Sequence, residues 1–244
     1  MDGGMSLRYG RLAVVLLSLS LALSTLELFV STTFTSGIDT RLLTGIVIYV
    51  FFLALGQVLG NAIPYFLDAK PVAADDPLWT KVAAAGLPAQ YLLVHASEPT
   101  AFSVQALKAP VTVLTSELVE KLSASALQGV LAHEAQHGTQ NHLRKSGALM
   151  AFLISVKFTL GIPSVLVPLT ILGFLWVLRY WEYEADLAAA KTHSPSAMLA
   201  ALEEVRQLQA PSFWTRAPEI FMAFPRWQKR VARIQHLANE QNRV

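Results

Sequence analysis

The chain has 244 residues, of which 53% are hydrophobic and 15% are charged, and it contains no cysteine. An average soluble domain has about 25% charged residues, so this composition indicates a membrane protein. Without cysteine the chain can form neither a disulfide nor a thiolate metal site, and a bound metal would need histidine and carboxylate ligands. The formal net charge of +2 gives no sign of nucleic-acid binding.

Two long apolar stretches, Leu12–Val30 and Leu42–Leu67, predict an N-terminal transmembrane hairpin. Each reaches the about 20 residues that a helix needs to span a bilayer. The short polar segment 31–41 between them predicts a turn outside the membrane. A cleaved secretory signal is the alternative for the first stretch, because two arginines precede it, although the second long stretch argues against this.

The segment that follows predicts a soluble α+β unit. Residues 68–77 are rich in Pro, Ala and Asp and indicate a linker at the membrane exit. The predicted elements are a helix at Trp79–Ala85, strands at Tyr91–His95 and Val111–Leu114, and helices at Ser116–Leu122 and Ala124–Asn141.

The last of these helices carries an H-E-x-x-H motif formed by His133, Glu134 and His137. Histidines one helical turn apart share a face and can bind one Zn²⁺, while the glutamate can take a proton from a water at the open coordination position. Ser123 is a candidate N-cap. The alternative is a coincidental set of polar residues on a solvated helix face. His142 lies about 140° away from the ligand face and is expected to be solvated or interfacial, and His95 is expected to be packed or hydrogen-bonded rather than metal-bound.

A further apolar block, residues 146–178, predicts a second membrane hairpin. Gly161, Pro163 and Pro168 are expected to break it into two halves. Since both halves are short for independent spans, a partly inserted or re-entrant hairpin is an open alternative. About four transmembrane or membrane-inserted helices are therefore expected.

The Lys and Arg residues beside the apolar stretches predict the orientation in the membrane. Arg8, Arg11, Arg144, Lys145 and Arg179 all lie next to predicted membrane segments and are expected on the cytoplasmic side. The protein is expected to be a multi-pass protein of a bacterial inner or archaeal plasma membrane. Its active site is expected to face the cytoplasm.

A second acidic motif follows the apolar block directly. Glu182 and Asp186 are one helical turn apart, and a His₂Glu set is an established set of catalytic zinc ligands. Glu182 is therefore the predicted third ligand, and Asp186 the carboxylate that accepts the second N–H of a ligand histidine. Glu184 is expected to be solvated. The neighbouring Tyr and Trp residues also fit an aromatic belt at the membrane interface.

Four segments resemble the membrane zinc peptidases that include the bacterial heat-shock protease HtpX and the CAAX prenyl endopeptidases. Residues 99–103 are similar to the family's P-N-A-F-A, 111–122 to V-x-V-T-x-x-L-L, 130–137 to V-L-A-H-E-x-x-H, and 179–186 to R-x-x-E-Y-x-A-D. The resemblance implies a gluzincin-type catalytic domain with a small β-sheet. The expected parts are a transmembrane hairpin (1–67), a first part of the peptidase domain (68–145), a second membrane hairpin (146–178) and a second part of the peptidase domain (179–244).

The resemblance implies the same roles for the site residues. Zinc would be bound by His133, His137 and Glu182, Glu134 would be the general base and acid, and Asp186 would support a ligand. It also implies that an extended substrate pairs as an added strand with Ala101, Phe102, Ser103 and Val104.

The sequence departs from the family at two positions, Thr100 in place of Asn and Phe224 in place of the histidine of a late His-Pro-Pro motif. Because phenylalanine cannot donate a hydrogen bond, another residue would have to stabilise the oxyanion of the tetrahedral intermediate. The candidates are Arg230, His193 and Tyr183.

The predicted function is a zinc-dependent endopeptidase that acts on peptides or membrane proteins, in membrane-protein quality control. A specific processing peptidase for a membrane or lipidated peptide is one alternative, and a non-catalytic zinc-bound membrane scaffold is another. No nucleotide-binding motif is visible, so activity without ATP is expected. The expected partners are the peptide or membrane-protein substrate and the lipid bilayer. The sequence indicates no nucleic-acid partner and leaves the oligomeric state open.

Overall fold

The computed structural model describes residues 38–72, 75–85, 90–105, 110–163, 166–208 and 224–241. The first predicted span, Leu12–Val30, lies outside the described residues. The helices of the described part are α2 (Ile38–Phe66), α3 (Pro77–Ala84), α4 (Ser116–Lys121), α5 (Ala124–Thr139), α6 (His142–Leu160), α7 (Val167–Thr192), α8 (Pro195–Leu208) and α9 (Trp227–Gln241). The strands are β1 (Lys70–Pro71), β2 (Gln90–Val94), β3 (Ala101–Gln105) and β4 (Pro110–Thr115). The protein is thus mainly helical with a small sheet, as predicted.

The sheet is mixed, with strand order β1-β2-β4-β3. The central strands β2 and β4 are parallel, whereas β1 and β3 run antiparallel to their neighbours. The strands predicted at Tyr91–His95 and Val111–Leu114 are confirmed as β2 and β4. In the described sheet β3 is an edge strand, so one side of its main chain is not paired with another strand.

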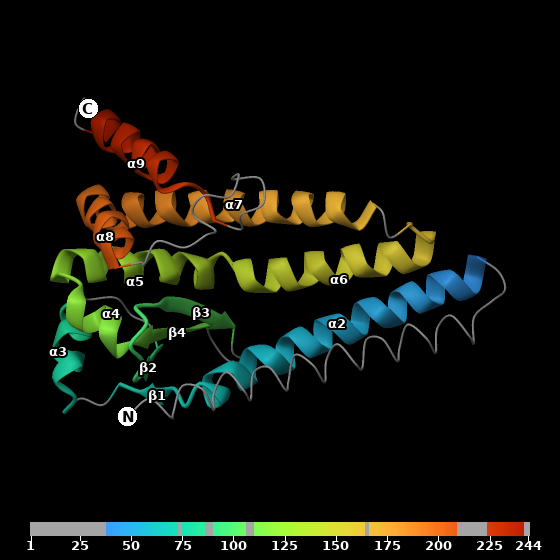
Figure 1. The fold of residues 1–244 in the computed structure, drawn as a ribbon, viewed down its shortest axis with the longest axis horizontal. Coiled ribbons are helices and arrows are strands. Elements are labelled where there is room, and N and C mark those ends of the chain that lie inside the picture. Colours follow the sequence, from blue (N-terminus) through green and yellow to red (C-terminus); the bar gives the residue numbers. More distant parts are fainter. Residues whose placement is uncertain are drawn as a thin grey trace.

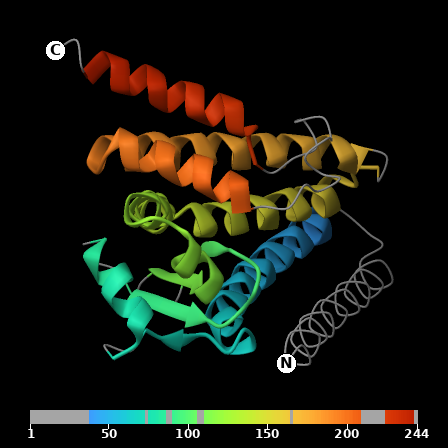
Figure 2. The same ribbon diagram turned by 60° about the vertical axis from the view of Figure 1, so that its left-hand side comes forward.

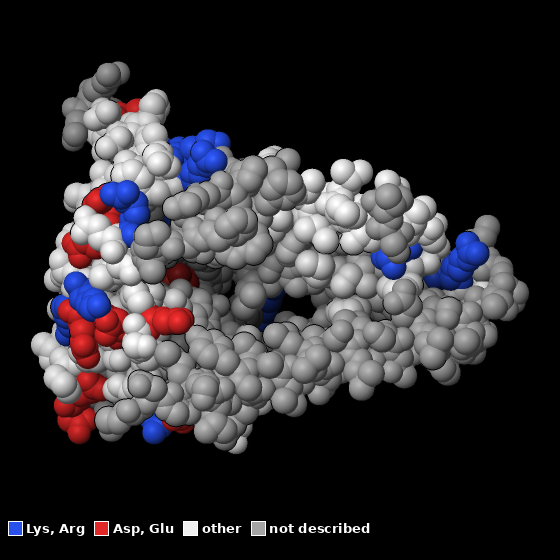
Figure 3. All heavy atoms as spheres, viewed as in Figure 1, with Lys and Arg blue, Asp and Glu red and all other residues white. Residues whose placement is uncertain are grey.

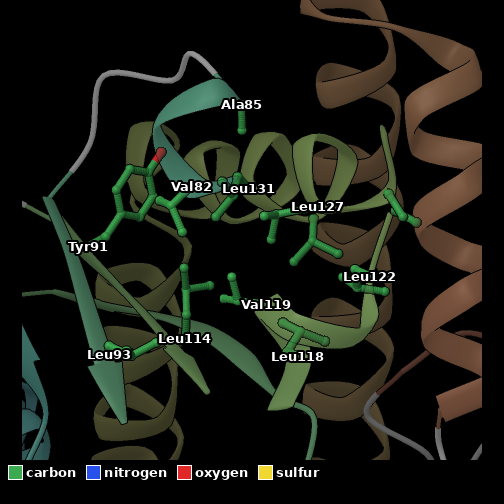
Figure 4. Packing of buried hydrophobic residues seen from close by; sticks show 13 residues of the cluster. Val82, Ala85, Tyr91, Leu93, Leu114, Leu118, Val119, Leu122, Leu127 and Leu131 are labelled. Atoms are coloured by element: carbon green, nitrogen blue, oxygen red, sulfur yellow. The ribbon is translucent and has the colours of Figure 1, made fainter. Parts of the chain in front are cut away.

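One face of the sheet packs against α3, α4 and α5. Figure 4 shows Leu127 and Leu131 of α5 in the same buried cluster as Leu114 of β4, Val119 of α4 and Val82 of α3. These side chains are almost completely removed from water, which fixes the position of α5 relative to the sheet.

The helix α5 lies between the sheet on one side and α7 and α8 on the other (Figures 1 and 2). Figure 1 also shows α2, α6 and the first part of α7 running away together from the end of the protein that holds the sheet. Helix α9 packs on the outer side of α7 and α8.

The break between α6 and α7 differs from the prediction at Pro168. Gly161 ends α6 with a left-handed backbone (φ 62°), as a helix C-terminus favours, but Pro168 lies in the first turn of α7 and does not interrupt it. A proline in the first turn costs no intrahelical hydrogen bond. Consequently α7, one continuous helix of 26 residues, carries both the second half of the apolar block and the acidic motif.

Only one of the described helices is long and apolar enough to cross a membrane by the usual length and hydropathy test, and it covers Thr40–Phe66 of α2. Its mean hydropathy is 2.3, and 18% of the most apolar window is buried inside the protein, so α2 is not a core helix. Helices α6 and α7 do not meet the test, and the expectation of about four membrane helices remains a prediction. Figure 3 shows that the acidic side chains visible in this view gather at the end that holds the sheet.

The close contact between α5 and α8 depends on Gly129. A Cβ atom at this position would lie 2.3 Å from the main-chain oxygen of Ala197 and 2.8 Å from the Cβ of Ala201. The nearest of these atoms belongs to the backbone of α8 and cannot move aside easily.

We therefore expect Gly129→Ala to destabilise the protein by about 1–3 kcal/mol, the usual cost of overpacking. The control is Gly147→Ala in α6, where a Cβ would meet nothing within 4 Å and the higher helix propensity of alanine should be neutral or stabilising. Thermal unfolding in detergent measures both variants. Equal stability of Gly129→Ala and the unchanged protein would contradict the tight α5–α8 contact.

Candidate active site

The helix that carries the H-E-x-x-H motif is fixed at its first turn. The hydroxyl of Ser123 accepts a hydrogen bond from the Ala126 N–H at 3.2 Å, which confirms the predicted N-cap. The carboxylate of Glu204 on α8 accepts hydrogen bonds from the Ser123 N–H at 2.8 Å and the Ser123 hydroxyl at 2.6 Å. The start of α5 is therefore tied to α8, and the side chains of the motif project from a rigid element.

Three predicted ligands converge between α5 and α7. The Nε2 atoms of His133 and His137 are 3.0 Å apart. Glu182 places one carboxylate oxygen 3.5 Å from His133 Nε2 and the other 3.4 Å from His137 Nε2. Among the described residues these three form the group of His and acidic side chains that could hold a metal ion.

The separations between these atoms place the three groups within reach of one ion. The two histidine nitrogens are 3.0 Å apart, and each lies 3.4–3.5 Å from a different oxygen of Glu182. One ligand atom from each residue lies within 4.8 Å of the others. The donor set of two imidazoles and one carboxylate also matches what a cysteine-free chain can offer to zinc.

The second nitrogen of His133 faces a buried ion pair. Its Nδ1 is 2.8 Å from Asp186 Oδ1, and Arg230 from α9 makes two contacts with the same carboxylate, Nε–Oδ2 at 2.6 Å and Nη2–Oδ1 at 2.7 Å. The same guanidinium also lies 3.8 Å from Glu182 Oε2. Asp186 thus contacts His133, while its role as the support of a metal ligand stays a prediction, and Arg230 compensates the charge of both acids.

The pKa values of these groups follow from their contacts. Burial acts to raise the pKa of Glu182 and Asp186, but hydrogen bonds outweigh this effect and lower both pKa values. Glu182 accepts from His133 and His137. Asp186 accepts from Arg230 and His133. Burial acts to lower the pKa of His133, yet hydrogen bonds to Asp186 and Glu182 raise it to about 10. The acids therefore stay ionised, and the site attracts a positive charge between the two histidines, which a metal ion can supply in place of a proton.

The predicted base, Glu134, is buried and is held by the edge strand. The hydroxyl of Ser103 on β3 lies 2.9 Å from Glu134 Oε2 and 2.8 Å from the Glu134 main-chain oxygen, and can donate its one proton to either of them. The predicted substrate strand and the predicted base are therefore in direct contact.

The histidine His142 contacts the site, although the sequence indicated a solvated or interfacial residue. The predicted helix Ala124–Asn141 ends at Thr139, because Asn141 adopts a left-handed backbone (φ 55°) and α6 begins at the next residue. This turn brings His142 Nδ1 to 2.9 Å from His137 Nδ1, and its ring stacks on Trp181. The signal in the sequence is Asn141 itself, since asparagine tolerates this conformation better than most residues.

The remaining candidates lie around this centre. Glu184 is partly exposed, with a carboxylate oxygen 3.6 Å from His142 Nε2, and His95 is exposed at the end of β2. Of the three oxyanion candidates, Arg230 lies next to the predicted metal ligands. Tyr183 lies under the guanidinium of Arg233 at 3.6 Å. His193 is exposed at the C-terminal end of α7, about 16 Å along the helix from Glu182. Phe224 is 60% exposed. The residue that stabilises the oxyanion remains a prediction.

Comparison with known proteins agrees with this arrangement. The model of peptidase family M48 matches residues 78–238. Protease HtpX of Haemophilus ducreyi (strain 35000HP / ATCC 700724) is 26% identical over 196 residues, which cover 63% of this chain and 68% of that protein.

The fold has a counterpart among solved structures. The crystal structure of S. mikatae Ste24p superposes with a TM-score of 0.65 at 18% sequence identity, and the match covers 93% of this chain. It covers 66% of the Ste24p chain, so this chain spans slightly less than two thirds of that protein. Because the family model matches well over half of the chain and includes the whole H-E-x-x-H and acidic motifs, the chain belongs to peptidase family M48.

Proposed function

We propose that this protein is an integral-membrane, zinc-dependent endopeptidase. The observation that carries the proposal is the convergence of His133, His137 and Glu182 within reach of one ion, beside a buried glutamate that contacts an edge strand. A site that only stabilised the fold would not need this glutamate, and this disfavours the alternative of a non-catalytic scaffold.

In this proposal each residue has one role in peptide hydrolysis. A Zn²⁺ ion held by His133, His137 and Glu182 would polarise the scissile carbonyl and acidify a water molecule. Glu134 takes the proton from that water and later delivers it to the leaving amine. Asp186 and Arg230 keep His133 oriented and balance the charge of Glu182.

Substitution of the base tests this function. Glu134→Gln keeps the size of the side chain but cannot accept the proton, so we expect turnover to fall by about 10²–10⁴-fold while the zinc content stays unchanged. The assay follows cleavage of an unstructured, casein-like protein in detergent, with and without chelator, next to a metal analysis of each sample.

The matched control is Glu120→Gln on the exposed surface of α4, which should retain full activity. Equal turnover of Glu134→Gln and the unchanged protein would remove Glu134 from the mechanism. Zinc binding without turnover in the unchanged protein would favour the scaffold.

The substrate is proposed to bind as an additional strand on the free edge of β3. The Thr115 N–H donates to the Thr100 main-chain oxygen at 3.0 Å, and hydrogen-bonded pairs alternate along an antiparallel ladder. By this alternation the main-chain groups of Phe102 and Val104 form hydrogen bonds with β4, while those of Ala101 and Ser103 point to the outer edge of the sheet. Ser103 links this edge to Glu134, which supports binding of the scissile bond next to the base.

Removal of one outward N–H tests the strand proposal. Ala101→Pro deletes that donor at an edge position where proline is tolerated. The loss of one hydrogen bond, worth about 0.5–1.5 kcal/mol, should decrease kcat/KM by about 3- to 10-fold. Ala101→Gly, which retains the N–H, is the control. If both variants show the same kcat/KM as the unchanged protein, the substrate does not pair with this edge.

The proposed substrates are membrane proteins or peptides close to the membrane, in a quality-control role. The C-terminal end of α2 supports this, because Ile63 and Leu67 pack against the buried cluster of Val94, Val104 and Val113 in the sheet. The long apolar helix is thereby joined to the strand beside the active site. Profiling of cleaved proteins distinguishes broad degradation from cleavage of one processing substrate.

The apolar segments are proposed to form about four transmembrane or membrane-inserted helices around this catalytic unit. Helix α6 packs along α2, with the Ser155 hydroxyl donating to the Gly45 main-chain oxygen at 2.6 Å, so both helices share one environment. Large exposed apolar side chains on α2, α6 and α7 fit contact with lipid, and include Leu42, Ile46, Val50, Val58, Phe152, Leu169, Ile171 and Trp176.

Labelling of introduced cysteines tests the orientation, since the chain has none of its own. With the active site facing the cytoplasm, an impermeant maleimide added to intact cells should label Pro163→Cys between α6 and α7 and should label Glu120→Cys only after permeabilisation. Labelling of Glu120→Cys in intact cells would show that the active site faces the opposite side of the membrane. Pro163→Cys that is labelled only after permeabilisation would indicate a re-entrant hairpin.

A further inference from the structure

His142 is the one histidine in contact with the proposed ligands that has no role so far. It is 4% exposed, and its Nδ1 lies 2.9 Å from the Nδ1 of His137. Its ring is stacked on Trp181 with an interplanar angle of 13° and a centroid distance of 5.5 Å. Trp181 is adjacent to Glu182, so α7 provides both the third ligand and the surface that holds the His142 ring.

The contact between the two Nδ1 atoms restricts where the protons lie. At 2.9 Å one nitrogen must donate and the other accept. His137 Nε2 faces the other ligands and must be unprotonated to bind a metal, so in neutral His137 the proton is on Nδ1. His142 must then accept at Nδ1 and carry its own proton on Nε2, which lies 3.6 Å from the Glu184 carboxylate, beyond hydrogen-bond distance.

We propose that His142 is a positioning residue for the metal ligand His137. It fixes the tautomer and the ring orientation of His137, as Asp186 does for His133, and Trp181 keeps the accepting nitrogen in place. This inference rests on the proposed metal site. The two ligand histidines thus have different outer partners, because His133 faces a charged carboxylate paired with Arg230 and His137 faces a neutral imidazole.

Two substitutions separate the hydrogen bond from the packing. His142→Phe retains an aromatic ring for the stack on Trp181 but has no acceptor, and His142→Asn places a carbonyl oxygen near the position of Nδ1. Loss of an outer partner of a metal-binding histidine typically weakens metal affinity by about 10- to 100-fold. We expect His142→Phe to raise the zinc dissociation constant by this factor and His142→Asn to restore most of the affinity.

Zinc affinity is measured by competition with a chromophoric chelator, with the thermal stability of the metal-free proteins recorded beside it. His95→Phe, a change at an exposed histidine, is the control and should not alter the affinity. Failure of the unchanged protein to bind zinc would reject the proposed function. Zinc binding by the unchanged protein with the same affinity in folded His142→Phe would reject the role of His142 alone.

The unchanged, zinc-loaded protein provides a measurement that does not depend on a variant. Nitrogen-15 NMR of its six histidines distinguishes the two neutral tautomers. We expect the proton on Nδ1 of His137 and on Nε2 of His142. A proton on Nδ1 of His142 would overturn the proposal even if His142→Phe fails to fold.

Discussion

The pairing of two carboxylates on α7, the half-buried Glu182 and the buried Asp186, with two histidines on α5 is the constraint on which the rest of the site depends. Glu182 and Asp186 are one turn apart, as are His133 and His137, so two helices in contact bring four polar groups together at once. Buried acids are tolerated only with a compensating charge, and Arg230 on α9 provides it. The site therefore depends on the position of α9, although Arg230 lies 44 residues after Asp186 in the chain.

The local parts of this arrangement could be predicted from the sequence. The H-E-x-x-H spacing, the i, i+4 spacing of the acids, the Ser123 cap and the strands β2 and β4 are all short-range patterns that depend on helix and strand geometry. The contact of Asp186 with His133 follows from the helix face that Asp186 shares with Glu182, which the i, i+4 spacing indicates.

The contacts that were missed depend on single backbone angles or on tertiary packing. One left-handed residue, Asn141, redirects the chain and moves His142 from an expected solvated or interfacial position to a buried contact with His137. The contact of Ser103 with Glu134 joins residues 31 apart and has no local pattern. Pro168 was expected to break a helix, but its position in the first turn of α7 leaves the helix intact.

X-ray absorption at the zinc edge of the purified protein tests the central claim most directly. One zinc ion per chain is expected, with two imidazole nitrogens at about 2.0–2.1 Å and carboxylate oxygen at about 2.0–2.2 Å. The Glu182→Gln variant should lose most of the bound metal. Absence of zinc, or a first coordination shell without two imidazoles, would contradict the account in which His133, His137 and Glu182 hold the metal.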